Sequence, residues 1–169
     1  MATRVGLSLG SNLGDRLANL REARKLLRRL TPVGVHYEQA PVYQSDPFEC
    51  PPGSPDFYNT VIELDYVGDP YRLHQDTQGI EYHLGRETVR ERNTPRVIDI
   101  DILYFDQLVI DDPLLVIPHP RMTHRRFVLQ PLAEIRPRLV LPGDRDSISE
   151  HLRRLDSGEP ELRMVQATW

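Results

Sequence analysis

The stretch from residue 97 to residue 105 limits the possible folds more than any other part of the chain. Isoleucines alternate with Asp99 and Asp101 between residues 98 and 102, and this period of two is typical of a strand with one buried face. Aspartate is otherwise disfavoured in strands. The pattern therefore predicts a central strand whose two carboxylates project from the face opposite the isoleucines, with their Cα atoms roughly 7 Å apart.

The periodicity of the preceding residues predicts the rest of the sheet. Alternating apolar residues indicate strands at about 4–10 and 33–37, and residues 59–65 are rich in β-formers. Apolar residues three or four apart indicate helices over 13–30 and 70–84, the second capped by Asp69 and ended by Gly85. This order predicts an α+β fold, a ferredoxin-like split β-α-β antiparallel sheet with helices on one face and mobile catalytic loops.

The remaining segments give weaker signals. Five prolines between residues 41 and 55 predict a long loop without regular structure. A short return strand is expected at 108–110, a turn at 118–120 and a short helix at 125–135, and a capping box from Ser147 to Glu150 predicts a last helix to about 155. The tail from Asp156 carries no usable pattern, and a length of 169 residues predicts one compact domain over 1–169.

Composition excludes several classes of site. The net charge of -4 and the lack of a basic run argue against a nucleic-acid partner. Cys50 is the only cysteine, which excludes an internal disulfide and a multi-cysteine metal site. Lys25 is the only lysine, which excludes a P-loop, so arginines and a metal would have to hold any ATP phosphates. Neither a signal peptide nor a long apolar run is evident, which predicts a cytoplasmic protein.

The paired aspartates suit two hard cations held about 3.5–4 Å apart, as two-metal phosphoryl chemistry requires. The alternative is a sheet whose second face is exposed to solvent, where aspartates are tolerated. The spacing of the two aspartates alone favours neither explanation. Arg86, Arg90, Arg92 and Arg96 fall just upstream. Guanidinium groups bind phosphate oxygens in a bidentate way. These arginines would otherwise be read as a solvated loop paired with neighbouring glutamates, but their position beside the aspartates favours a phosphate site.

Three further features could complete such a site. His119 lies in a stiff turn between two prolines and could donate to a phosphate or protonate a leaving oxygen, although a lone loop histidine is more often structural. Phe57 and Phe127 offer aromatic faces, and Asn59 offers an amide that can both donate to and accept from a flat heterocycle. On their own the two aromatics would be assigned to the core.

These pieces, in this order, resemble the 6-hydroxymethyl-7,8-dihydropterin pyrophosphokinase family. The resemblance runs from Gly10-Ser-Asn-Leu-Gly14 to about Pro142 and is densest in Gly85-Arg86, Glu91-Arg92, Pro95-Arg96-x-x-Asp99-x-Asp101-Ile102, Pro118-His119, Arg125, Phe127 and Pro131-Leu132. It implies transfer of pyrophosphate from ATP to the pterin alcohol, giving AMP and the pterin diphosphate in folate synthesis. The catalysis implied is positioning plus charge neutralisation, without a covalent intermediate.

The resemblance also implies residue roles. Asp99 and Asp101 would bind two Mg²⁺ ions, and Arg86, Arg96 and His119 would act on the transferring phosphates. The implied ATP contacts are Gln78, Glu81, Arg92, Ile102, Leu115, His119 and Arg125, with Gln78 and Glu81 on one face of the second helix. The implied pterin contacts are Ser45, Pro47, Phe48, Phe57, Asn59 and Phe127. ATP and the pterin are the expected partners of a monomer that binds neither nucleic acid nor membrane.

The chain departs from the family pattern at Thr88, Val89, Asn93, Leu114 and Pro120, where members often carry basic or aromatic residues, and Arg90 is expected to supply some of the missing charge. Two other functions were considered. One is a non-catalytic ferredoxin-like module that binds a nucleotide or metabolite. The other is a two-metal nuclease or nucleotidyl transferase, against which the missing basic surface argues.

Overall fold

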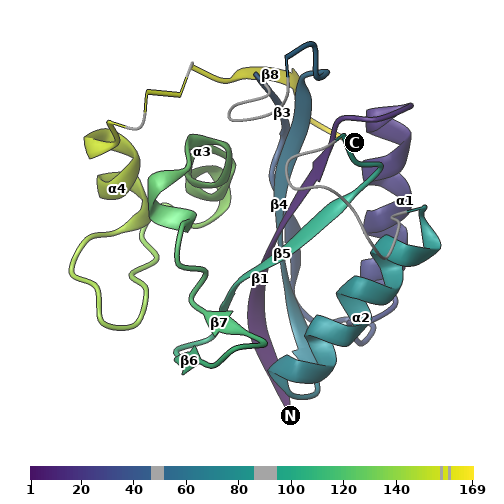
Figure 1. The fold of residues 1–169 in the computed structure, drawn as a ribbon. Helices are drawn as coiled ribbons and strands as arrows, with labels where there is room; N and C mark the ends of the chain where they lie inside the picture. The colour runs from purple at the N-terminus through teal and green to yellow at the C-terminus, as the bar shows by residue number, and fades with distance from the viewer. Residues whose placement is uncertain (47–51, 86–94, 157, 160) are drawn as a thin grey trace.

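The computed structural model describes residues 1–46, 52–85, 95–156, 158–159 and 161–169. A six-stranded antiparallel sheet runs through its centre in the order β5-β1-β4-β3-β8, and β2 also pairs with β4 (Figure 1). The strands are β1 (Ala2–Ser11), β2 (Tyr37–Gln39), β3 (Val42–Ser45), β4 (Phe57–Val67), β5 (Asp99–Phe105) and β8 (Arg163–Gln166). β6 (Ile110–Asp111) and β7 (Val116–Ile117) form a separate small sheet.

Helices cover both faces of the large sheet. α1 (Arg16–Arg28) and α2 (Pro70–His83) lie on one face, and α3 (Arg126–Ile135) and α4 (Ile148–Arg154) lie on the other (Figure 1). A short 3-10 helix, η1 (Met122–His124), precedes α3. The predicted ferredoxin-like sheet is confirmed. The expectation of helices on one face holds only for α1 and α2, because β4 and β5 also present apolar residues to α3.

The first core lies between the sheet and the first two helices. Val5, Leu7 and Leu9 of β1 point toward α1 and α2, as their alternation predicts, and all three are at most 1 % exposed. They pack with buried residues of both helices and of β5, namely Leu20, Ala23, Leu27, Leu73, Ile80, Ile98, Ile100 and Ile102. Full burial of one such side chain is worth about 1.5–3 kcal/mol, so this face fixes the direction of the side chains from Asp99 to Ile102 on β5.

The second core lies under α3 and depends on a close approach at Gly6. Leu103 and Tyr104 of β5 both pack here with Val61, Leu129 and residues of α4, where the register of β1 and β5 shifts beside Gly6. A Cβ on Gly6 would lie 2.3 Å from the Tyr104 ring. Glycine is therefore required at this point for the tyrosine to lie flat on β1.

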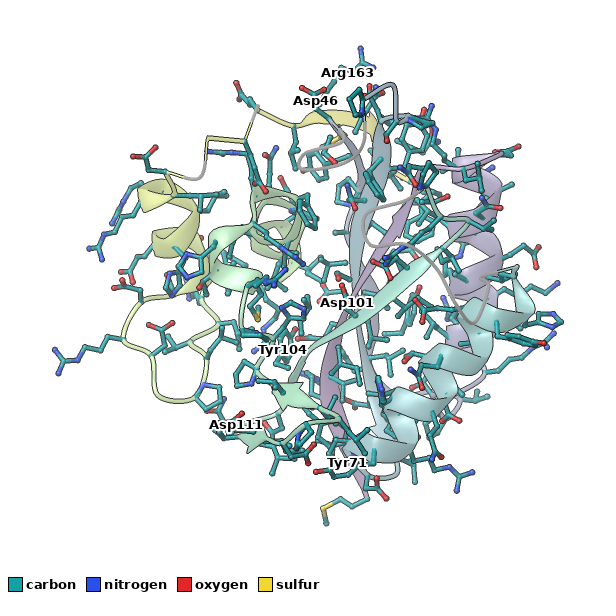
Figure 2. All side chains as sticks on the ribbon, viewed as in Figure 1. Asp46, Tyr71, Asp101, Tyr104, Asp111 and Arg163 are labelled. Carbon is teal, nitrogen blue, oxygen red and sulfur yellow. The ribbon has the colours of Figure 1, made fainter. Side chains whose placement is uncertain are left out.

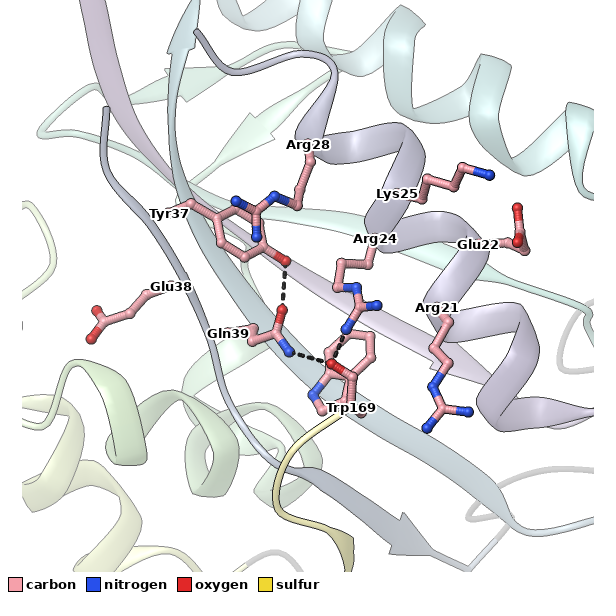
Figure 3. A pocket seen from close by; sticks show the side chains of 9 residues that line it. All are labelled: Arg21, Glu22, Arg24, Lys25, Arg28, Tyr37, Glu38, Gln39 and Trp169. Carbon is pink, nitrogen blue, oxygen red and sulfur yellow. Dashed lines mark hydrogen bonds between the residues drawn. The ribbon is translucent and has the colours of Figure 1, made fainter. Parts of the chain in front are cut away.

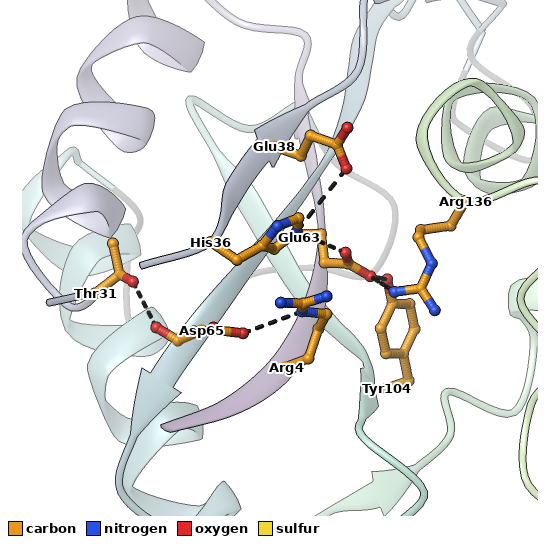
Figure 4. A network of polar contacts seen from close by, with 8 residues as sticks. All are labelled: Arg4, Thr31, His36, Glu38, Glu63, Asp65, Tyr104 and Arg136. Carbon is orange, nitrogen blue, oxygen red and sulfur yellow. Dashed lines mark hydrogen bonds and ion pairs between the residues drawn. The ribbon is translucent and has the colours of Figure 1, made fainter. Parts of the chain in front are cut away.

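A buried polar network crosses this second core (Figure 4). Glu63 of β4 is fully buried, and its carboxylate accepts hydrogen bonds from Tyr104 Oη and Arg136 Nη1, both at 2.5 Å. The His36 ring lies 2.8 Å from its other oxygen. Burial, followed by the neighbouring Glu63 charge, raises the pKa of Tyr104 far above its usual range. Glu63 thus links β4, β5 and the end of α3.

The helix caps agree with the sequence, whereas three strands do not. Asp69 accepts from Arg72 N–H at 2.9 Å, and the Ser147–Glu150 capping box forms both of its hydrogen bonds. The strand expected over 33–37 begins only at Tyr37, and β3 forms inside the proline-rich stretch that was expected to be irregular. β8 forms in the tail that showed no pattern. β3 is stabilised by pairing with β4 and β8, and β8 by pairing with β3, which local composition does not reveal.

Candidate active site

Asp99 and Asp101 project from the same face of β5, as predicted. Both side chains are half-buried, whereas Ile100 and Ile102 between and beside them lie in the first core. The carboxylates therefore point to the face that carries α3, and Figure 2 marks Asp101 near the middle of β5. The prediction of a central strand is wrong, because β5 lies at the edge of the sheet. Its Ile100 N–H donates to Glu81 Oε2 at 2.9 Å. Glu81 thus anchors the strand that holds both aspartates.

The strand register places a second functional side chain in line with Asp99. Gly10 of β1 is paired with Asp99 on one side and with Asn59 of β4 on the other. With neighbouring strands about 4.8 Å apart, the Cα atoms of Asp99 and Asn59 lie roughly 10 Å apart, with Gly10 between them. This spacing leaves room for a flat ligand that touches Asn59 at one end and reaches the aspartates at the other.

The residues around Asn59 form the predicted pterin end of the site. Asn59 is 6 % exposed, and its Nδ2 donates to Ser45 Oγ at 2.6 Å. Phe57 lies two residues away on the same strand face, and a Cβ on Gly10 would lie 2.8 Å from Asn59 Oδ1 and 3.6 Å from the Phe57 ring. The missing side chain at position 10 therefore lets both residues lie over β1. Pro47 and Phe48 fall outside the described residues.

Arg96 lies at the entry to β5, next to Asp99. Its Nη1 donates to Asp99 Oδ1 at 3.1 Å, while its Nε is buried and has no hydrogen-bond partner among the described residues. The main chain of Arg96 is held by Asn12, whose Oδ1 accepts from Arg96 N–H at 2.7 Å and whose N–H donates to Arg96 O at 3.1 Å. Asn12 was noted only as part of the Gly10–Gly14 motif, and its role depends on a contact across 84 residues.

His119 lies after a cis Ile117–Pro118 peptide bond, with its N–H donating to Leu103 O at 2.8 Å. Its Nδ1 accepts from Arg121 N–H at 3.1 Å, so in the neutral ring the proton is on Nε2. Burial, together with the charges of Arg125 and Arg121, lowers the pKa of His119 from 6.5 to about 4. At neutral pH His119 is therefore a neutral hydrogen-bond donor.

Arg125 and Phe127 stand beside this histidine at the start of α3. The Arg125 Cζ lies 5.3 Å from the centroid of the Phe127 ring, a cation-π contact, and both side chains are half-buried. A guanidinium predicted to contact ATP and a ring predicted to contact the pterin therefore touch each other. This contact couples the two halves of the predicted site.

The other predicted ATP contacts occupy different environments. Gln78 and Glu81 both lie on α2, but Gln78 is exposed, whereas Glu81 is 4 % exposed and bound to β5. Ile102 and Leu115 are buried in the first core, on the side of β5 away from the aspartate carboxylates. Arg86 and Arg92, like Arg90, Thr88, Val89 and Asn93, lie outside the described residues.

The family model of 7,8-dihydro-6-hydroxymethylpterin-pyrophosphokinase (HPPK) matches residues 6–137, a range that contains every residue of the geometry above. The chain belongs to the HPPK family. The predicted reaction class is thereby confirmed, because HPPK enzymes transfer pyrophosphate from ATP to the hydroxymethyldihydropterin in folate synthesis. Neither alternative function, the binding module or the nuclease, agrees with this family.

HPPK relatives occur both alone and within longer proteins. The chain is 40 % identical over 159 residues to the 2-amino-4-hydroxy-6-hydroxymethyldihydropteridine pyrophosphokinase of Methylorubrum extorquens, covering 91 % of this chain and 94 % of that protein. The Bacillus subtilis enzyme is 42 % identical over 134 residues, covering 76 % of this chain and 75 % of that one. The folic acid synthesis protein fol1 of Pneumocystis carinii is 35 % identical over 155 residues, but this chain spans only 20 % of its length.

A solved structure supports the fold. An HPPK-DHPS protein of Plasmodium falciparum superposes with a TM-score of 0.72 over 91 % of this chain and 45 % of that one, at 15 % identity. Such low identity shows the HPPK fold alone. Among the residues that the structure describes, no helix is long and apolar enough to cross a membrane.

Proposed function

We propose that this chain catalyses a magnesium-dependent transfer in which the pterin hydroxymethyl oxygen attacks the β-phosphorus of ATP. The new oxygen–phosphorus bond forms as the bond from the β-phosphorus to the α,β-bridging oxygen breaks. AMP leaves with that oxygen, and the hydroxyl proton goes to solvent. The observation that carries this proposal is the row Asp99–Gly10–Asn59, because an amide suited to a heterocycle and a carboxylate suited to a metal ion lie in register on neighbouring strands.

Asp99 and Asp101 fit two Mg²⁺ ions. Carboxylate oxygens are the hard ligands that Mg²⁺ prefers, and both side chains emerge half-buried from one face of a rigid strand. Bound there with ATP, the ions would neutralise charge on the phosphates and orient the two substrates. Arg96 pairs with Asp99 in the structure, so we expect its guanidinium to exchange this carboxylate for a phosphate oxygen when ATP binds.

Arg96 and His119 are the proposed phosphate donors. The buried Nε of Arg96 lacks a partner among the described residues, and burial without a partner is costly, which favours a ligand oxygen at that point. His119 presents Nε2–H and is neutral at pH 7. It would therefore donate a hydrogen bond to a phosphate oxygen rather than deliver a proton to the leaving group. Arg125, held against Phe127, would add a third positive group.

The pterin would lie between aromatic rings and over Gly10. Asn59 offers its carbonyl oxygen and one remaining N–H to the heterocycle, because Ser45 accepts from its amide nitrogen. Phe57 and Phe127 would supply the two stacking faces. Contacts of ATP with Gln78, Glu81, Ile102 and Leu115, and those assigned to Arg86, Arg92, Pro47 and Phe48, stay predictions. So do the cytoplasmic location, the single domain and the monomeric state.

The test is to identify the nucleotide product. The protein is incubated with ATP, the dihydropterin alcohol and Mg²⁺, and nucleotides are separated by anion-exchange chromatography. We expect one AMP for each pterin consumed, and no turnover when EDTA replaces Mg²⁺. Formation of ADP with a monophosphorylated pterin would refute pyrophosphoryl transfer. Full turnover in EDTA would leave the transfer intact but refute the proposed metal dependence.

A further inference from the structure

A hollow of about 710 Å³ lies on the face of the sheet opposite the aspartates. We name it the arginine hollow and define it by Arg21, Arg24 and Arg28 of α1, Tyr37 and Gln39 of β2, and Trp169 (Figure 3). Tyr37 and Trp169 pack against the first core, with α1, whereas Asp99 and Asp101 point to the other face. The arginine hollow is therefore separate from the HPPK active site.

Two of its guanidinium groups are held in place by aromatic rings. The Arg24 Cζ lies 5.0 Å from the centroid of the Trp169 ring, and the Arg28 Cζ lies 4.1 Å from that of Tyr37. Arg24 also donates to the main-chain oxygen of Trp169, to which Gln39 Nε2 donates at 2.9 Å. Cation-π and hydrogen-bonded contacts of this kind limit the rotamers of long side chains. The hollow thus presents preorganised positive groups rather than freely moving ones.

The cationic side chains of the arginine hollow lack carboxylate side-chain partners among the described residues. Arg21 and Lys25, and likewise Arg24 and Arg28, are like-charge pairs four residues apart, which destabilise a helix. In the part of the chain that the structure describes, none of these four side chains forms an ion pair with a carboxylate side chain. Glu22 and Glu38 line the rim without pairing to them. An anion bound between the arginines would remove this repulsion.

We propose that the arginine hollow binds a small molecule that carries two or more linked phosphate groups. Arg21 and Arg28 are seven residues apart on α1, so their Cα atoms are about 10 Å apart along the helix axis. This length exceeds one phosphate and suits a chain of them, to which guanidinium groups donate in a bidentate way. The volume lies within the range of small-molecule sites, about 300–1,000 Å³.

The chain contains its own reporter of this site, because Trp169 is its only tryptophan and lies in the hollow. Tripolyphosphate is titrated into the full chain in EDTA, at constant ionic strength, while tryptophan fluorescence is recorded. Pyrophosphate, orthophosphate and sulfate are titrated in parallel. We expect a saturable change with tripolyphosphate, tighter than that with pyrophosphate, and much weaker binding of orthophosphate and sulfate.

The test variant is Arg21→Gln/Arg28→Gln, which removes two charges and leaves the Arg24–Trp169 contact in place. Arg153→Gln on α4 is the matched control, because Arg153 is exposed and far from the hollow. We expect the double variant to weaken tripolyphosphate binding at least tenfold and Arg153→Gln to leave it unchanged, while both keep the wild-type melting temperature and AMP-forming activity. Arg24→Gln, which removes the guanidinium that contacts both the ring and the main-chain oxygen of Trp169, should weaken binding as well.

Three results would overturn the proposal. One is equal affinity for tripolyphosphate in the wild type and the double variant. Another is a fluorescence change that sulfate reproduces at the same ionic strength, since it would show general screening. The third is saturable binding of a single-stranded oligonucleotide when tripolyphosphate gives no signal, since it would assign the surface to a macromolecule. None of these results depends on whether the active site turns over.

Discussion

Asn12 clamps the main chain of Arg96 through two hydrogen bonds, one from each residue's N–H group, at 2.7 and 3.1 Å. Asn12 directly follows β1, and Arg96 lies just before β5, so this clamp joins the two strands that carry the site. The guanidinium that pairs with Asp99 is thus positioned by a residue 84 positions earlier.

Asn12→Ala should lower kcat roughly 10- to 100-fold. Without the clamp the Arg96 guanidinium can shift, and a displacement of a catalytic group by about 1 Å strongly reduces the reaction rate. Steady-state kinetics with saturating substrates measures the effect, normalised to folded protein. The matched control is Asn19→Ala, which removes hydrogen bonds to Ser11 and Leu13 in the same turn but does not touch Arg96. Equal losses of kcat in both variants would show that Asn12 only stabilises the turn.

Gly10→Ala should weaken pterin binding while ATP binding stays nearly unchanged. The added Cβ would lie 2.8 Å from Asn59 Oδ1, so the amide must shift away from β1 and out of its present position beside Ser45. Titration calorimetry with each ligand measures the two affinities. Gly79→Ala is the control, because a Cβ there meets nothing within 4 Å. An unchanged pterin affinity in Gly10→Ala would show that Asn59 does not contact the heterocycle.

Asp101→Asn should lower kcat by roughly three orders of magnitude, because metal-held charge stabilisation is worth several kcal/mol. The thermal melt should stay cooperative and close to that of the wild type, since the side chain points away from the first core. Asp111→Asn on β6 is the control for loss of one carboxylate. A large drop in melting temperature for Asp101→Asn alone would indicate a structural role instead.

His119 should make folding stability sensitive to acid. Its folded pKa of about 4 lies below the ordinary 6.5, so the unfolded chain takes up the proton first as the pH falls. The stabilisation is present above pH 6.5 and is lost toward pH 4. Between pH 7 and pH 5, the wild type should lose roughly 1–2 kcal/mol more than His119→Asn, measured by urea unfolding. Parallel losses would mean that the histidine titrates normally.

The Glu63 network should be costly to break from one side. Arg136→Met removes the guanidinium and leaves a fully buried carboxylate with Tyr104 and His36. We expect a loss of about 3–5 kcal/mol in the free energy of unfolding. The double variant Glu63→Gln/Arg136→Met should recover much of it, because no buried charge remains. A double variant as unstable as the single one would show that packing, rather than charge, dominates.

The strands and helices with strong periodicity could be predicted because burial selects one face of each. The isoleucines of β5 lie in the first core, so Asp99 and Asp101 had to project to the opposite face. The caps at Asp69 and Ser147 are local hydrogen bonds, set by residues three positions apart. The sequence also determined the chemistry of the site, since it offers carboxylates and arginines but no P-loop.

Tertiary structure alone decided what these residues meet. β3 and β8 form by pairing with each other across more than 100 residues, and such short strands carry too few residues to show a period. The row Asp99–Gly10–Asn59 depends on the register of three strands, and the Asn12–Arg96 clamp spans 84 residues. The hydrogen bond from Ile100 N–H to Glu81 anchors β5, and the sequence does not reveal it because the two residues lie on different elements. Periodicity fixes which way a side chain points, but the residue it touches is fixed by long-range packing.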